Sequence, residues 1–215
     1  MSADALPTVD LTEWPHTFTE GDAADAPVVL TLHGTGGDER EIAALGPALV
    51  PGAAVLSPRG RVREGTANRW FRRLGEGVFD VDDVIARAGE LAAFTTAARE
   101  HYGLGERRLI ATGFSNGANI ALATALLHPD VVSTAVAFSG MHPFAEREPG
   151  GSAAGVALLL LNGDHDAMAP ATSVDRLVAF ASARGASVDR RRRPGGHGID
   201  RAELAAAQEW LAARL

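Results

Sequence analysis

The sequence predicts an α/β domain with a mostly parallel sheet and helices on both of its faces. One observation is a series of short apolar runs bounded by glycine or proline, the pattern of strands buried on both faces. Another is that stretches of helical periodicity lie between these runs, and regular alternation of strand and helix is typical of parallel sheets. The third is a hydrophobic content of 46% in 215 residues, enough for one substantial core.

Six apolar runs are predicted to be the strands of this sheet. Each is short, and most of them end at a glycine or proline, which stops regular structure. They are residues 27–32, 53–57, 108–112, 134–138, 156–161 and 186–192. The segment 14–20 is expected to add an antiparallel edge strand.

Helical periodicity marks the stretches between the strands. Apolar residues recur at the spacing of one helix face over residues 82–101, 174–181 and 204–215, and residues 118–127 are rich in alanine. We find neither an internal repeat nor a linker between domains. The sequence therefore predicts one α/β domain over residues 27–215, preceded by an acidic segment at residues 1–26.

The charge distribution argues against a nucleic-acid partner. The formal net charge is −7, and the first 26 residues hold six acidic residues and no basic one. The remainder is nearly neutral, without the basic surface that nucleic acid requires. All 20 basic residues are arginine, and cysteine is absent. This composition excludes a lysine Schiff base, a P-loop lysine, disulfides, thiolate catalysis and zinc–thiolate sites.

No segment has the pattern of a targeting or membrane sequence. The first residues lack a basic stretch followed by an apolar one, so they do not resemble a signal peptide. The longest purely aliphatic run, residues 156–161, is far shorter than the ~20 residues that a membrane span needs. We expect a cytoplasmic protein with no membrane partner.

The strongest motif is Gly-Phe-Ser-Asn-Gly at residues 113–117. It follows a predicted strand and opens a predicted helix, which is the context of a nucleophilic serine at a sharp turn. Ser115 is the candidate nucleophile, and the backbone N–H of Asn116 can point at a developing oxyanion. Glycines two residues before and after Ser115 are expected because strand and helix pass close together. The alternative is a glycine-rich turn whose serine only caps the helix.

A base and an acid are available in two later loops. His197 lies in Pro-Gly-Gly-His-Gly, after the last predicted strand, where the glycines let the loop carry an imidazole across the strand ends. Asp164 and Asp166 both follow the strand at residues 156–161, and either one can accept the His197 ring N–H. The alternative of a metal site at Asp164-His165-Asp166 needs further ligands that no other segment obviously supplies.

A glycine-rich loop follows the first buried strand. In His-Gly-Thr-Gly-Gly at residues 33–37, the backbone N–H of Thr35 is the most plausible second oxyanion donor, and His33 is expected to brace the loop. A plain glycine-rich loop is the alternative. A phosphate loop is disfavoured because no lysine follows.

These residues resemble the phospholipase/carboxylesterase family of α/β-hydrolases, which includes small bacterial carboxylesterases and acyl-protein thioesterases. The chain order Ser115, Asp166, His197 is that of the α/β-hydrolases. The matching pieces are Leu-His-Gly-Thr-Gly-Gly-Asp at 32–38, Ser-Pro-Arg-Gly at 57–60, Gly-Phe-Ser-Asn-Gly-Ala-Asn at 113–119, Asn-Gly-Asp-His-Asp-Ala-Met-Ala-Pro at 162–170 and Gly-Gly-His-Gly at 195–198. Asn-Arg-Trp-Phe-Arg-Arg-Leu at 68–74 is similar to a bacterial subgroup linked to the metabolism of hydroquinone-type aromatics.

The resemblance implies a single α/β-hydrolase domain with a minimal cap. It selects Asp166 over Asp164 as the acid and implies oxyanion donors at Thr35 and Asn116. The chain departs from the family where His-Gly often starts the acid turn and Val-Pro often ends it; residues 162–163 are Asn-Gly and residues 169–170 are Ala-Pro.

The function that follows is a serine carboxylesterase acting on small or medium acyl esters through an acyl-enzyme. The same triad also suits a lactone, a thioester or a ring-cleavage product of aromatic catabolism, and a non-catalytic binding scaffold is a weaker alternative. The expected partner is a small-molecule ester, with no metal or organic cofactor. Small hydrolases of this family can pair, so a homodimer is possible.

Candidate pocket residues come from loops near the predicted site. They are Trp70, Phe71, Phe79, Phe114, Met141 and Met168, and for each of them packing in the core is an equal alternative. The arginines at 69, 72 and 73 are interpreted as part of a solvated loop rather than as contacts to an acidic substrate. The run Arg190–Arg193 is interpreted as an edge strand with its charges in solvent and in ion pairs.

Overall fold

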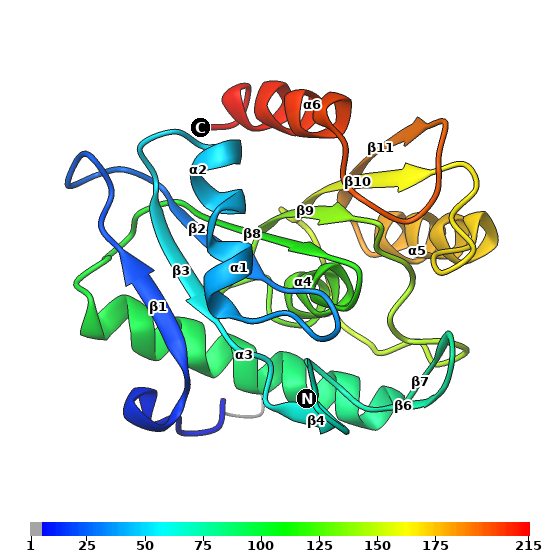
Figure 1. Cartoon of the computed structure of the whole chain (residues 1–215), viewed down its shortest axis with the longest axis horizontal. Coiled ribbons are helices and arrows are strands. Elements are labelled where there is room, and N and C mark those ends of the chain that lie inside the picture. The colour runs from blue at the N-terminus through cyan, green and yellow to red at the C-terminus, as the bar shows by residue number, and fades with distance from the viewer. Residues whose placement is uncertain (1–5) are drawn as a thin grey trace.

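A seven-stranded sheet forms the centre of the molecule (Figure 1). In the computed structural model, which describes residues 6–215, six neighbouring strands are parallel and one edge strand is antiparallel. The order across the sheet is β1 (His16–Thr19), β3 (Ala54–Pro58), β2 (Val28–Leu32), β8 (Leu109–Phe114), β9 (Thr134–Phe138), β10 (Ala157–Gly163) and β11 (Ser187–Arg193).

The six predicted parallel strands all form, with bounds that differ by at most two residues. The antiparallel edge strand also forms, as β1, in which Thr17 pairs with Ser57 of β3. The later part of the acidic segment at residues 1–26 is thus joined to the sheet, while residues 1–5 lie outside the described residues.

The strand order reverses beside β2, and this reversal positions the site. From β2 the chain first adds β3 on one side and then crosses to add β8 on the other side. In open parallel sheets the loops at the carboxyl ends of such a pair of strands diverge and leave a crevice between them. The loops that contain Thr35 and Ser115 follow β2 and β8, so they flank this crevice.

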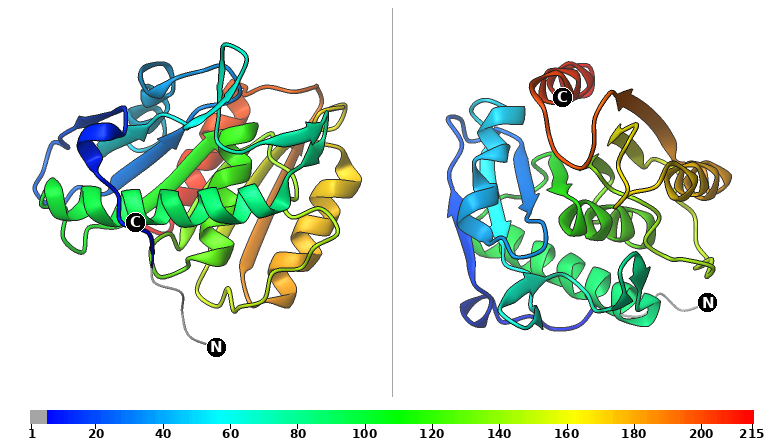
Figure 2. Two further views of the ribbon diagram at one scale, coloured as in Figure 1. Left: turned by 90° about the horizontal axis from the view of Figure 1, so that it is seen from below. Right: turned by 45° about the vertical axis from the view of Figure 1, so that its right-hand side comes forward.

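Helices cover both faces of the sheet (Figure 2). One face packs against α3 (Val81–His101), α4 (Asn116–Leu127) and α5 (Ala171–Ala183). The other face packs against α1 (Glu39–Ala43), α2 (Leu45–Leu49) and α6 (Arg201–Ala212). Both faces of the inner strands are therefore shielded, as their continuous apolar sequences predict.

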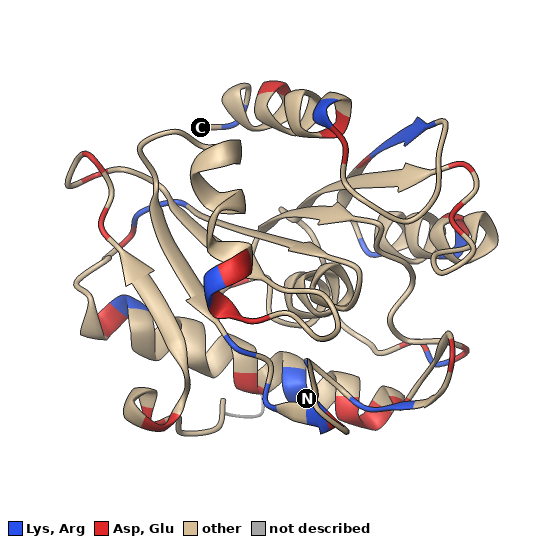
Figure 3. Ribbon diagram, in the orientation of Figure 1, with Lys and Arg blue, Asp and Glu red and all other residues tan. Residues whose placement is uncertain are grey.

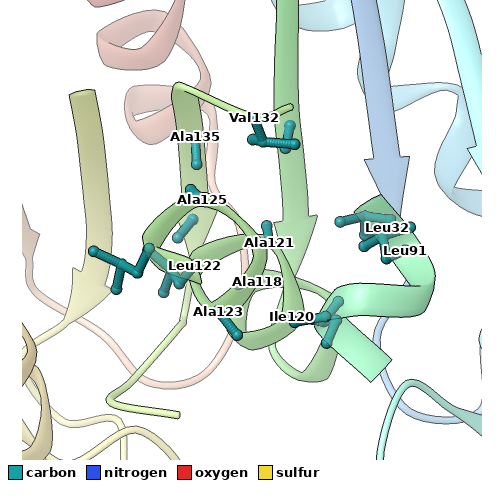
Figure 4. Close-up of a cluster of buried hydrophobic side chains, with 14 of the residues drawn as sticks. Leu32, Leu91, Ala118, Ile120, Ala121, Leu122, Ala123, Ala125, Val132 and Ala135 are labelled. Carbon is teal, nitrogen blue, oxygen red and sulfur yellow. The ribbon is translucent and has the colours of Figure 1, made fainter. Parts of the chain in front are cut away.

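Helix α4 lies at the centre of the larger core. Eleven of its twelve residues are buried, and Figure 4 shows its alanines between β8, β9 and α3. Alanine side chains allow the backbone of α4 to lie close to the sheet on one side and to α3 on the other. The alanine-rich composition thus reflects close packing of α4 as well as helix propensity.

The turn from β8 into α4 is the tightest part of this packing. A Cβ atom on Gly117 would lie 2.0 Å from the Leu32 carbonyl oxygen of β2. A Cβ atom on Gly113 would lie 2.5 Å from the Gly117 carbonyl carbon. Both positions therefore require glycine, as the sequence predicts for the residues two before and two after Ser115.

Several short elements were not expected from the sequence. They are α1, α2, a short 3₁₀ turn at Leu11–Glu13, and two hairpins, β4 (Val62–Glu64) with β5 (Ala67–Arg69) and β6 (Arg73–Gly75) with β7 (Val78–Phe79). The two helices have five residues each, too few for a periodic apolar pattern. Six of the eleven residues in the hairpin strands are arginine, glutamate, asparagine or glycine, and the last three types are uncommon in strands.

Charged residues lie mainly outside the inner strands (Figure 3). The exception within the sheet is the edge strand β11, which carries Arg190–Arg193. Among residues 6–215, no helix combines the length and the apolar character that crossing a bilayer requires.

A buried histidine packs beside the carboxyl end of the sheet. His142 is only 4% exposed, and its ring lies edge-on to Phe180 with 4.9 Å between the ring centroids. Neither ring nitrogen has a hydrogen-bond partner within residues 6–215. Burial, together with the nearby Arg176, lowers the pKa of His142 to about 4. The folded protein therefore holds this ring neutral.

We expect Gly117→Ala to lower the free energy of unfolding by more than about 3 kcal/mol, because its Cβ atom would overlap the Leu32 carbonyl and force strand and helix apart. Urea titration followed by circular dichroism measures this change. Gly150→Ala is the matched control, since no atom lies within 4 Å of its Cβ position. Equal stabilities of the two variants would contradict the close-approach argument.

We expect the replacement His142→Phe to flatten the acid side of the stability profile. Because the folded-state pKa is about 4 and the ordinary value is 6.5, the unfolded chain takes up the proton first as the pH falls. Stability is complete above about pH 6.5 and declines by roughly 3 kcal/mol towards pH 4 in the wild type but not in the variant. Urea titrations across this range measure the difference.

Phe144→Leu, in the same aromatic cluster, is the control, because it removes packing but no titratable group. Its destabilisation should be similar at every pH. Parallel profiles for wild type and His142→Phe would show that His142 does not cause the acid sensitivity.

Candidate active site

Ser115 sits at the sharp turn between β8 and α4. Its φ of 53° and ψ of −113° form a backbone conformation that side-chain-bearing residues rarely adopt. The turn is held by the Ser115 N–H, which donates to the Phe138 carbonyl at 2.9 Å. The side chain makes no capping hydrogen bond with α4, which excludes the alternative of a serine that only caps the helix.

Asp166 is held rigidly in the loop after β10. Its side chain is fully buried, and Oδ1 accepts the backbone N–H groups of Met168 at 2.9 Å and Ala169 at 3.0 Å. The His197 Nδ1 atom lies 2.8 Å from Asp166 Oδ2. With the proton on Nδ1, the other ring nitrogen, Nε2, is left as a proton acceptor.

Asp164 has a different partner from Asp166. It forms an ion pair with Arg192, with 2.7 Å between Oδ1 and Nε, and its side chain is one-third exposed. Residues 6–215 contain no group of three or more histidine, cysteine, aspartate or glutamate side chains arranged to hold a metal ion. The two aspartates of this turn therefore serve separate partners.

The loop that carries His197 is folded around one arginine. Arg193 donates to the carbonyls of Gly196 at 3.0 Å and Gly198 at 3.1 Å. Its Nε lies 2.7 Å from Glu203 of α6, and this pairing raises the pKa of Arg193. The last residue of the arginine run thus supports the histidine loop, whereas Arg190 and Arg192 make the expected ion pairs, with Asp175 and Asp164.

The acid turn and the histidine loop are joined by backbone contacts. The Asp164 N–H donates to the Arg193 carbonyl, and the His165 N–H donates to the Gly195 carbonyl, both at 2.8 Å. A Cβ atom on Gly163 would lie 2.4 Å from the Gly195 oxygen. The pairing of β10 with β11 therefore continues past the strand ends and aligns Asp166 with His197.

Two contacts bring the histidine loop to the ends of β8 and β9, beside the serine turn. The ring of Phe114, the residue before Ser115, lies 4.9 Å from the His197 ring, centroid to centroid. Ser139 Oγ accepts the Gly198 N–H at 3.2 Å and donates to the Gly198 carbonyl at 3.1 Å. Ser139 follows β9 and has a φ of 50°, a second strained non-glycine residue at this edge.

The β4–β5 hairpin braces the loop after β2. The Gly36 N–H donates to the Asn68 carbonyl at 2.9 Å, and Asn68 Nδ2 donates to the Gly37 carbonyl at 2.8 Å. His33 also braces this loop, as the sequence predicts. Its Nε2 accepts the Gly60 N–H at 2.9 Å, and burial lowers its pKa.

Trp70 connects both predicted oxyanion elements. Its indole N–H donates to the His33 carbonyl at 2.9 Å, and its backbone N–H donates to Asn116 Oδ1 at 2.8 Å. The backbone N–H groups of Thr35 and Asn116 have no acceptor in the part of the chain that the structure describes. Both amides are thus available at the edge of the same cavity.

A cavity of about 340 Å³ adjoins Ser115. Its walls include the predicted oxyanion residues and three of the predicted pocket residues. The predicted residues that line it are Thr35, Phe79, Ser115, Asn116, Met141 and Met168. Its volume is within the range of small-molecule sites.

Three predicted pocket residues lie elsewhere. Trp70 and Phe71 are at most 2% exposed and belong to the hydrophobic core, and Phe114 packs on His197 outside this cavity. Successive residues of an extended segment point in opposite directions, so Arg69 lines the cavity and Trp70 enters the core. The interpretation of Arg69 as part of a solvated loop is wrong, since its side chain is 5% exposed.

Sequence reasoning did not identify Ser139, Asn68 or Arg193 as supports of the site. Each is recognised by the backbone groups that it contacts across the fold, and these contacts leave no local pattern in the sequence. For Arg193 alone a signal exists, because it directly precedes the Pro-Gly-Gly-His-Gly segment that it supports.

Comparison with known proteins places this geometry among hydrolases. The putative hydrolase MhqD of Bacillus subtilis (strain 168) is 35% identical over 195 residues, which cover 91% of this chain and 96% of MhqD. The crystal structure of the Bacillus cereus carboxylesterase has a TM-score of 0.89 and 32% identity, covering 95% of this chain and 96% of the other. A Mesorhizobium loti carboxylesterase structure has a TM-score of 0.86 and 31% identity, covering 96% and 98%.

The strand order, the helices on both faces and these likenesses establish an α/β-hydrolase fold. The phospholipase/carboxylesterase family model matches residues 16–215. The chain therefore belongs to the phospholipase/carboxylesterase family of α/β-hydrolases.

Proposed function

We propose that the protein is a serine carboxylesterase in which Ser115, His197 and Asp166 form the catalytic triad. The observation that carries the proposal is the buried Asp166–His197 hydrogen bond, held against a strained serine turn at the edge of a cavity. The Ser115 side chain makes no helix-capping hydrogen bond, and a histidine oriented by a buried carboxylate is the arrangement of a general base for such a serine.

Acylation begins when Ser115 Oγ attacks the ester carbonyl carbon and His197 Nε2 takes the hydroxyl proton. Asp166 stabilises the imidazolium and keeps the proton of Nδ1 in place. The Thr35 and Asn116 N–H groups hold the oxyanion of the tetrahedral intermediate. In comparable sites, one such donor contributes roughly 10²–10³ in rate.

His197 then protonates the leaving alcohol oxygen as its bond to the carbonyl carbon breaks. The product is an acyl ester on Ser115. A water molecule gives its proton to His197 and attacks this ester, and the returning proton restores the Ser115 hydroxyl as the carboxylic acid leaves. Small or medium acyl chains suit the volume of the cavity, about 340 Å³.

We expect Ser115→Ala and His197→Ala each to lower kcat/KM more than about 10³-fold while the fold persists, because nucleophile and base act as a unit. A series of p-nitrophenyl esters from acetate to palmitate measures the activity, and circular dichroism measures the fold. The maximum should fall at short or medium chains. Ser152→Ala, at an exposed serine, is the control and should match wild type.

A folded Ser115→Ala variant with undiminished esterase activity would overturn the assignment. If the wild type is inactive but its Ser115 reacts with a serine-directed phosphonate, Ser115 is still assigned as the nucleophile. Lactones and thioesters are then the substrates to test. An inactive wild type without this labelling would favour a binding scaffold.

We expect Asp166→Asn to lower kcat about 10⁴-fold, because an amide at this position no longer selects the productive histidine tautomer. Asp164→Asn should change kcat less than about tenfold, since it removes only a partly exposed ion pair with Arg192. Steady-state kinetics on the best ester compare the two variants. The opposite ranking would assign the acid to Asp164.

A further inference from the structure

Arg69 places a buried positive charge in the wall of the proposed active site. It lies on β5, lines the same cavity as Ser115, and exposes only 5% of its side chain. Its Nη1 donates to the Thr35 hydroxyl at 3.0 Å, which puts the guanidinium beside the proposed oxyanion loop. A charge in this position acts on any ligand that occupies the cavity.

Among residues 6–215, Arg69 shares the one carboxylate with which it forms an ion pair. Glu64 lies 3.2 Å from Arg69 Nη1 and 2.8 Å from Arg73 Nε, so one carboxylate is shared by two guanidinium groups. Arg73 also lines the cavity. Glu76 is a further lining residue, but it is exposed, and water screens its charge. The two arginines and two glutamates have no net charge together, and Arg69 is the one buried member of this group.

Two other arginines of this protein have carboxylate partners that they do not share with another arginine. Arg59 forms two hydrogen bonds with Glu39, and Arg193 lies near both Glu203 and Asp200. Within residues 6–215, the Nη2 group of Arg69 has no hydrogen-bond partner. Burial, only partly opposed by Glu64, lowers the pKa of Arg69. The Arg69 guanidinium thus retains the capacity to bind an anion.

We propose that the substrates of this site are esters that carry a carboxylate, and that Arg69, assisted by Arg73, binds this carboxylate. A guanidinium matches the geometry of a carboxylate and holds it more strongly when both are shielded from water. The inference rests on the proposed esterase function and specifies its substrate class. Arg69 is accordingly a specificity-determining residue.

Two matched pairs of esters test the proposal and locate the carboxylate. For the acyl side, mono-p-nitrophenyl adipate is compared with p-nitrophenyl hexanoate. For the alcohol side, para-acetoxybenzoate is compared with para-acetoxybenzamide. The readout is the ratio of kcat/KM for the anionic ester to that for its neutral partner, because a general defect of the enzyme cancels in this ratio.

We expect Arg69→Gln to lower the ratio about 10- to 100-fold in at least one pair, the loss typical of a shielded charged hydrogen bond. Arg73→Gln should lower it about threefold, since Arg73 is more exposed. Glu64→Gln should raise the ratio, because it frees the positive charge of both arginines. Raising the salt from about 0.05 to 0.5 M should lower the ratio in wild type.

Arg72→Gln is the matched control. Arg72 is an arginine of the same segment, 57% exposed, paired with Asp80 and absent from the cavity wall. Its replacement should leave the ratio unchanged. Equal losses on both members of each pair in Arg69→Gln, without a rise in Glu64→Gln, would overturn the proposal and leave Arg69 as a structural support of Thr35.

A wild type that cleaves none of these esters, and none of the p-nitrophenyl esters from acetate to palmitate, contradicts the proposed esterase activity but still allows the inference to be tested. Calorimetric titration of Ser115→Ala with adipate and para-hydroxybenzoate then replaces kinetics. At least tenfold weaker binding of one anion to Ser115→Ala/Arg69→Gln supports the carboxylate site. Equal binding to both proteins, or none to either, contradicts it.

Discussion

The close approach of α4 to β2 is the constraint on which the site depends. The Leu32 carbonyl oxygen lies 2.0 Å from the position of a Cβ atom on Gly117, so the loop after β2 and the serine turn after β8 must lie side by side. This contact brings Ser115 and Thr35 into the wall of one small cavity. Without it, the two loops that we propose to act on the same carbonyl group would lie apart.

The remaining parts of the site are extensions of the sheet. The parallel pairing of β10 and β11 runs on through hydrogen bonds at Asp164 and His165, so the acid and the histidine inherit their alignment from strand register. Ser139, which directly follows β9, binds Gly198 and so holds the histidine loop against the end of that strand. Loops held in this way behave as parts of a rigid scaffold, which proton transfer over hydrogen-bond distances requires.

The sequence was sufficient to predict the elements that have a periodic or glycine-bounded pattern. Strands such as Thr134–Phe138 and the close-packed glycines at 113 and 117 were predicted because their causes are local. The hairpins around Arg69 were not predicted, because their strands lack apolar alternation and are held by distant backbone groups. Whether the Trp70 side chain points into the core or into the cavity depends on the strand register, because a shift of one residue exchanges the two directions. No local signal in the sequence sets this register.

Arginine has two physical roles in this site, and the number of carboxylates near each arginine distinguishes them. Arg193 lies near two acids, so its charge is neutralised, and its Nη2 group donates to two carbonyls of the histidine loop. Arg69 is at least as buried but shares one glutamate with Arg73. A buried charge without its own counter-ion is costly for folding. Its persistence in the cavity wall is explained if a ligand completes the pair.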